Sequence, residues 1–128
     1  MLSRGVEEAE SLPDRNNCYG ELFAPDGLAA TARRLGAPWR AALRRSGYDG
    51  SVRLQLEGPG VELESEPLGG NAHLFDGAVA GDARSASEHM RQVSRALADA
   101  QVAHRLELYA ADDSLMISVG HAWPPRES

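Results

Sequence analysis

The chain has 128 residues, of which 42% are hydrophobic, and a formal net charge of −6, which is enough for one domain around a single core. The negative charge argues against a general nucleic-acid-binding protein, which needs a basic face. All 13 basic residues are arginine, which excludes Schiff-base, Walker or kinase-type lysine chemistry, and the single cysteine excludes an internal disulfide framework.

The two ends of the chain are polar. Residues 1–17 lack the apolar run of a signal peptide, so we expect a flexible N-terminal segment there, a single domain at 18–125 and a short tail at 126–128. No run approaches the roughly 18 apolar residues of a membrane helix. We therefore expect a cytoplasmic protein without a membrane partner, and the arginine-rich, lysine-free composition is typical of a bacterial source.

Two short helices are predicted next. Asp26 can cap a helix that ends before Gly36, and apolar residues recur on one of its faces. A second helix is predicted over 38–46, with Pro38 in its first turn.

The run ATARRLGAPWRAALRRSG resembles a bacterial helix-turn-helix at 28–46, with small Ala32, a turn at Gly36 and an arginine-bearing second helix. The resemblance implies a DNA-binding regulator in which Arg40 and Arg44 lie on the recognition helix. Arg45 departs from the family's apolar pattern, and no third helix follows nearby to complete its core.

Segment 52–66 has the clearest strand pattern, because apolar and polar residues alternate along it. We expect a hairpin with Leu54 opposite Leu63 and Arg53 opposite Glu64, which keeps all apolar side chains on one face.

Segment 69–82 is rich in glycine, and we interpret it as a surface loop that could include a short edge strand and could cover a ligand pocket. His73 and Asp76 within it could form an acid/base pair, but no nucleophile motif accompanies them. An amphipathic helix then begins at Ser85, with one apolar face made of Ala86, Met90, Val93, Leu97 and Ala100.

The last predicted element is a hairpin over 104–121, in which His104 faces His121 at the open end beside Trp123. Two histidines could share a metal ion, which normally needs three or four ligands. The interpretation we favour is that they close one end of the core, and a metal site at His104 and His121 is the alternative.

These elements predict an α+β fold. An antiparallel sheet of two hairpins flanks a central amphipathic helix in the order α-ββ-α-ββ, with helices covering one face of the sheet. This architecture is similar to bacterial type III secretion chaperones and to immunity proteins that neutralise a toxin. No motif carries the likeness, and the chaperones' final helix has no counterpart here.

The sequence holds no complete catalytic constellation. We therefore expect a non-enzymatic protein-binding module without a cofactor, either an immunity-type inhibitor or a secretion or assembly chaperone. The residues expected to contact the partner are Glu62, Glu64, Glu66, Arg40 and Arg44. An exposed edge strand would also allow a homodimer. The alternatives are DNA binding through 28–46 and a small-molecule or metal-binding domain.

Overall fold

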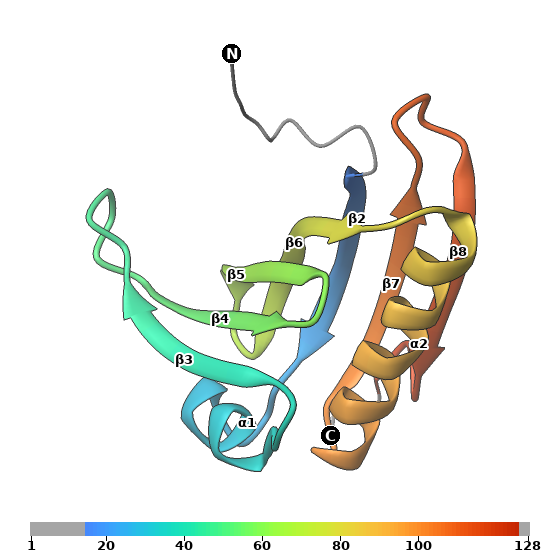
Figure 1. The fold of residues 1–128 in the computed structure, drawn as a ribbon. Coiled ribbons are helices and arrows are strands. Elements are labelled where there is room, and N and C mark those ends of the chain that lie inside the picture. The colour runs from blue at the N-terminus through green and yellow to red at the C-terminus, as the bar shows by residue number, and fades with distance from the viewer. Residues whose placement is uncertain (1–14, 126–128) are drawn as a thin grey trace.

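The computed structural model describes residues 15–125, which form one seven-stranded antiparallel sheet and two helices (Figure 1). The strand order is β3-β4-β5-β6-β2-β7-β8. In chain order the elements are β2 (Arg15–Phe23), α1 (Leu28–Arg34), β3 (Arg40–Arg45), β4 (Val52–Gly58), β5 (Val61–Gly69), β6 (Ala72–Ala80), α2 (Ala83–Asp99), β7 (Ala103–Tyr109) and β8 (Leu115–His121).

Strand β2 lies inside the sheet, between β6 and β7. It begins at Arg15, three residues before the predicted start of the domain at Cys18, and the rest of the predicted N-terminal segment lies outside the described residues. Its side chains alternate between buried and exposed positions, with Cys18 and Leu22 fully buried. This period of two is what a strand with one covered face requires.

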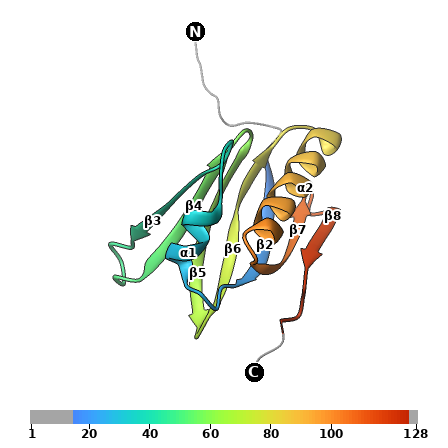
Figure 2. The same ribbon diagram turned by 90° about the horizontal axis from the view of Figure 1, so that it is seen from below.

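Both helices pack on the same face of the sheet (Figure 2). Helix α2 buries Ala86, Met90, Val93 and Leu97, as predicted, although Asp82 rather than Ser85 is its cap. The buried residues of both helices and the sheet join in one apolar cluster. Within residues 15–125 no helix covers the opposite face, and no helix is long and apolar enough to cross a membrane.

Gly20 sets the spacing between the central strands. It lies opposite Phe75 of β6 and Leu106 of β7, both fully buried. A Cβ atom at position 20 would stand 2.1 Å from the carbonyl oxygen of Arg105, so only glycine fits between these large side chains.

The predicted fold class is wrong. The structure is mostly sheet, with seven strands and two helices, instead of two hairpins around a central helix. Within residues 15–125 the first element is β2 and not a helix, so this part of the chain also departs from the architecture on which the likeness to chaperones and immunity proteins rested.

The second predicted helix, at 38–46, is also wrong, because Arg40–Arg45 forms strand β3 on β4. Residues 28–46 therefore do not form a helix-turn-helix, and Arg40 and Arg44 lie on a sheet. The buried Trp39 packs its ring against Gly58 of β4. This tertiary contact and the strand pairing outweigh the local helix preference of an alanine- and arginine-rich run.

The predicted loop at 69–82 is wrong as well, because most of it forms β6, paired with β5 and β2. Gly77 is one of the glycines that made the sequence resemble a loop, and in the structure it lies within β6 with φ +156. A Cβ atom there would stand 2.0 Å from the carbonyl oxygen of Glu62, so the glycine allows close approach of β5.

The two predicted hairpins differ in their outcome. In β7–β8 the predicted pairs are confirmed, including His104 with His121, up to an irregularity at Tyr109. In β4–β5 the hairpin and its faces are confirmed, but the register differs by two residues, with Leu56 opposite Leu63.

Candidate functional site

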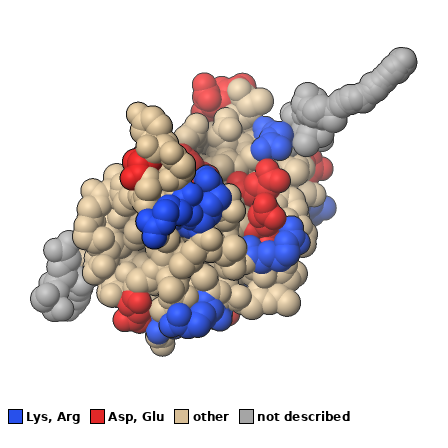
Figure 3. All heavy atoms as spheres, turned by 90° about the vertical axis from the view of Figure 1, so that its left-hand side faces the viewer, with Lys and Arg blue, Asp and Glu red and all other residues tan. Residues whose placement is uncertain are grey.

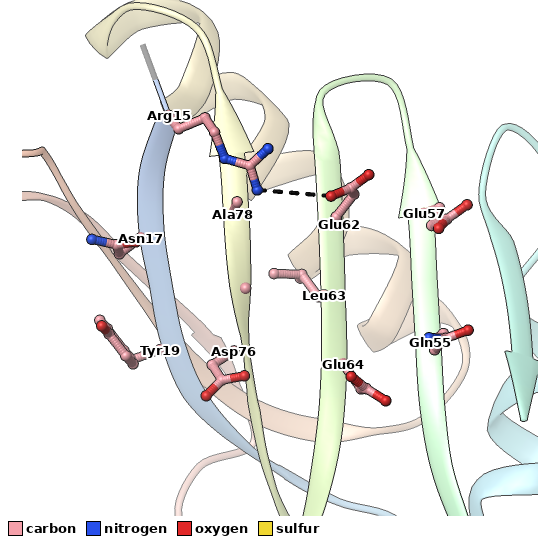
Figure 4. Close-up of a pocket in the computed structure, with 11 residues that line it drawn as sticks. Arg15, Asn17, Tyr19, Gln55, Glu57, Glu62, Leu63, Glu64, Asp76 and Ala78 are labelled. Atoms are coloured by element: carbon pink, nitrogen blue, oxygen red, sulfur yellow. Dashed lines mark ion pairs between the residues drawn. The ribbon is translucent and has the colours of Figure 1, made fainter. Parts of the chain in front are cut away.

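The sheet face that no described helix covers is the open face. Its centre carries a hollow of about 600 Å³, which we call the acidic hollow (Figure 4). It is lined by side chains or backbone of Arg15, Asn17, Tyr19, Gln55, Glu57, Glu62, Leu63, Glu64, Asp76, Gly77 and Ala78.

The pairing of the strands explains why these groups lie together. Gln55 of β4 is opposite Glu64 of β5, Glu64 is opposite Asp76 of β6, and Asp76 is opposite Tyr19 of β2. Because neighbouring strands lie about 4.8 Å apart, these four side chains form one row across the sheet. Glu57 and Glu62 form a second pair in the next row.

Arginines on the rim neutralise part of this charge. Arg40 lies 3.0 Å from Glu57, Arg44 contacts Glu64, and Arg15 lies 3.7 Å from Glu62. Exposed pairs of this kind contribute about 0–1 kcal/mol each, so a partner's cation can replace the arginine at small cost.

Asp76 differs from the other carboxylates of the hollow. Within residues 15–125 no arginine forms an ion pair with it, whereas Glu62 and Glu64 on the neighbouring strand β5 each have one. Partial burial raises the pKa of Asp76, and the charges of Glu66 and Glu64 raise it further. Asp76 therefore forms no ion pair within the described residues and lies next to carboxylates of the same sign, and the charge of Arg53 offsets only part of the rise in its pKa.

The side of the hollow away from the glutamates is aromatic. Tyr19 is 52% exposed, and its ring centroid lies 6.0 Å from that of Tyr109 on β7. A tyrosine face attracts the guanidinium or ammonium group of a cation. The hollow therefore offers carboxylates on one side and an aromatic ring on the other.

All five residues predicted to contact a partner lie on the open face. Glu62 and Glu64 line the hollow, and Glu66 continues along β5, 3.9 Å from Arg53. Arg40 and Arg44 reach the same face from β3 through their ion pairs. The predicted position of Arg53 opposite Glu64 is not observed, and Arg53 instead forms ion pairs with Glu66 and Asp49.

The sequence did not predict Glu57, Asp76 and Tyr19 as residues that contact a partner, and Asp76 was considered only as an acid/base pair with His73. Asp76 was assigned to a loop, and no local pattern places β6 or β2 beside β5. Buried and exposed positions alternate in 72–76 of the folded chain, but the apolar residues Leu74 and Phe75 are consecutive, so the sequence itself has no alternation that puts Asp76 on a strand face.

Charges of both signs are interleaved on the side of the molecule that carries β3 and β4. Arginine and carboxylate groups lie next to one another there (Figure 3). This side of the molecule is therefore not divided into two regions of opposite sign.

His104 and His121 lie beside each other, with ring centroids 6.1 Å apart. The His104 ring is buried: its Nδ1 donates to the Val102 carbonyl at 2.8 Å, so its Nε2 accepts from the Ser94 hydroxyl at 2.7 Å. Burial lowers the pKa of His104, the hydrogen bond to Val102 offsets part of this shift, and the charge of His121 adds to the lowering. Both ring nitrogens already have protein partners, which supports the role of closing the core.

No group of three or more histidine, cysteine or acidic side chains that could hold a metal ion occurs within residues 15–125. Cys18 is fully buried, and burial raises the pKa of its thiol to about 12, so it is not a reactive thiolate. His73 points into the core and Asp76 lies on the open face, so they do not form an acid/base pair.

Two other hollows lie at the end of the sheet near Trp123. One of about 730 Å³ lies between the β5–β6 turn and Trp123, near Phe23 and Leu68. It contains fewer charged groups than the acidic hollow, with Glu21 its one ionisable residue.

Comparison with protein-family models, curated proteins and solved structures found no match for this chain.

Proposed function

We propose that this chain is a non-enzymatic protein-binding module that binds a basic partner protein through the acidic hollow of its open face. The observation that carries the proposal is the placement of Asp76, which has no ion-pair partner among residues 15–125, beside three glutamates on an uncovered sheet face. Complementary charge gives such interfaces specificity and fast association. We also propose that the protein acts in the cytoplasm.

An immunity-type inhibitor fits this face better than a chaperone does. A chaperone for unfolded segments needs an extended apolar groove, whereas the hollow is lined mainly by charged and polar groups. Proteins that bind polyanions do so through a surface of clustered basic side chains, and an acidic inhibitor can bind such a surface. The expected partner is therefore a protein with a basic binding surface, which the acidic hollow would cover.

The test compares two variants that remove the same number of charges. Glu62→Gln, Glu64→Gln and Asp76→Asn remove three carboxylates from the hollow, and Glu88→Gln, Asp99→Asn and Asp113→Asn remove three from α2 and the β7–β8 turn. Wild-type and variant chains are used to capture partners from the host, and the dissociation constant of the purified partner is then measured.

We expect the wild type and the control variant to capture the same basic protein. The hollow variant should bind it at least about tenfold more weakly, and added salt should weaken the wild-type complex more than the variant complex. Equal binding by all three chains, or capture of a protein without a basic surface, would show that the acidic hollow is not the interface.

A further inference from the structure

The sheet is open, so two strands have an unpaired side. Within residues 15–125 these are β3 and β8, at the two ends of the strand order. A free strand edge presents N–H and C=O groups that can pair with another strand, and proteins usually block such edges with charges, prolines or bulges.

The two edges differ in charge. Strand β3 carries Arg40, Arg44 and Arg45 among its six residues. Strand β8 has the sequence LMISVGH and carries no aspartate, glutamate, lysine or arginine. The edge at β3 is therefore protected by charge, and the edge at β8 is not.

Charged residues and prolines flank the uncharged strand β8 on its two sides. Asp112 and Asp113 precede it in the turn, and Pro124 and Pro125 follow shortly after it. Pairing with another strand is thus confined to about seven residues.

Apolar side chains of β8 contact the core but remain partly exposed at this edge. Ile117 and Val119 pack against the core on the helix-covered face but are only partly buried, and Leu115 is 56% exposed. A strand added beside β8 would cover the remaining apolar surface of Ile117 and Val119.

Strand β8 is complementary to itself. If two copies pair in antiparallel fashion about a two-fold axis at Ser118, Ile117 of each copy lies opposite Val119 of the other. Ser118 then faces its own counterpart, and no acidic or basic side chain of either strand meets another one. An acidic chain with a net charge of −6 can therefore pair here without like charges in direct opposition.

We propose that the chain forms a homodimer in which the two β8 strands pair antiparallel about Ser118 and join the two sheets into one. This interface lies beyond the proposed function. The β8 edge is separated from β2, the nearest strand that lines the acidic hollow, by β7.

Ser118→Arg tests the dimer. Within one chain the new arginine lies opposite Glu107, which favours the folded monomer, but across the two-fold axis it faces a second arginine. The control is Ala42→Arg, which adds the same charge to an exposed position of β3. Analytical ultracentrifugation over a range of concentrations measures the dimer dissociation constant, and circular dichroism checks that each variant is folded.

We expect dimers of the wild type and of Ala42→Arg, and dimerisation of Ser118→Arg weakened about fivefold or more. An equimolar mixture of Ser118→Arg and Ser118→Asp should form a heterodimer, because opposite charges then meet at the axis. A wild type that stays monomeric at millimolar concentration, equal loss in Ala42→Arg, or no recovery in the mixture would overturn the proposal.

Discussion

Replacement of Asp76 by asparagine should make the free protein more stable while weakening its complex. In the folded chain the Asp76 carboxylate faces Glu64 across β5–β6, with Glu66 in the next position along β5. Partial burial raises the pKa of Asp76, the charges of these two glutamates raise it further, and the charge of Arg53 offsets part of the rise. Ionised Asp76 is therefore destabilising in the folded state at neutral pH, and an uncharged amide of similar shape removes that cost.

The size of the effect follows from the neighbours. A pair of like charges directly opposite on a sheet costs roughly 0.2–1 kcal/mol. Arg44 and Arg53 partly neutralise Glu64 and Glu66, and Asp76 is exposed to solvent, so the lower part of this range applies. We expect Asp76→Asn to raise the free energy of unfolding by about 0.5 kcal/mol at neutral pH.

The pH dependence identifies the cause. Because the folded state holds the Asp76 proton more tightly than the unfolded chain does, its ionisation costs stability as the pH rises through the folded-state pKa. Below the ordinary value of 3.8 both states are protonated, and the advantage of the variant should vanish. Urea unfolding of both chains at neutral and acidic pH measures this difference.

Asp112→Asn is the matched control with the opposite sign. Hydrogen bonds from the side chain and backbone of Ser114 lower the pKa of Asp112, so loss of its charge should destabilise the folded protein at neutral pH. A variant Asp76→Asn that is less stable than the wild type at neutral pH, or equally more stable at every pH, would refute the reasoning.

Two further predictions concern the core. Gly20→Ala should lower the free energy of unfolding by more than about 4 kcal/mol, because its Cβ atom would lie 2.1 Å from the Arg105 carbonyl oxygen. The control Gly36→Ala has open space around it and should change the free energy of unfolding by no more than about 0.5 kcal/mol. Thermal unfolding of the two variants measures the difference. The lowered pKa of buried His104 means that the unfolded chain binds its proton more readily, so stability should fall as the pH drops below 6.5. His104→Asn should show a shallower fall between neutral and mildly acidic pH in urea unfolding, and an unchanged slope would contradict this role.

How much of the fold could be predicted depends on how local the determining contacts are. The β7–β8 hairpin was predicted almost completely, because strict alternation and a short turn leave one register that buries both apolar faces. In β4–β5, a shift of two residues keeps the same faces. Hydrophobic pattern alone therefore could not choose between the two registers.

Strands β3 and β6 could not be predicted from local pattern. Strand β3 consists of residues that favour a helix, and its conformation depends on pairing with β4 and on burial of Trp39. In β6, Gly77 and Ala78 interrupt the apolar alternation, and the need for a small residue there comes from β5.

The same distinction applies to the candidate site. Glu62, Glu64 and Glu66 were predicted because one strand places alternate residues on one face. Asp76 and Tyr19 join them only because β6 and β2 lie next to β5 in the sheet order. That order is set by contacts between segments more than 40 residues apart in the sequence, such as Tyr19 with Asp76. Local sequence patterns therefore do not predict it.

The two proposals have a joint consequence. A two-fold axis that pairs antiparallel edge strands runs perpendicular to the joined sheet, so the open faces of both copies point in the same direction. Each acidic hollow would remain uncovered, since β7 and β8 lie between it and the axis. A dimer would therefore bind an immobilised basic partner at two points, and avidity would increase its apparent affinity. Ser118→Arg should lower the apparent affinity on a densely coated surface but leave the one-to-one dissociation constant in solution unchanged, whereas loss of the hollow's carboxylates should weaken both.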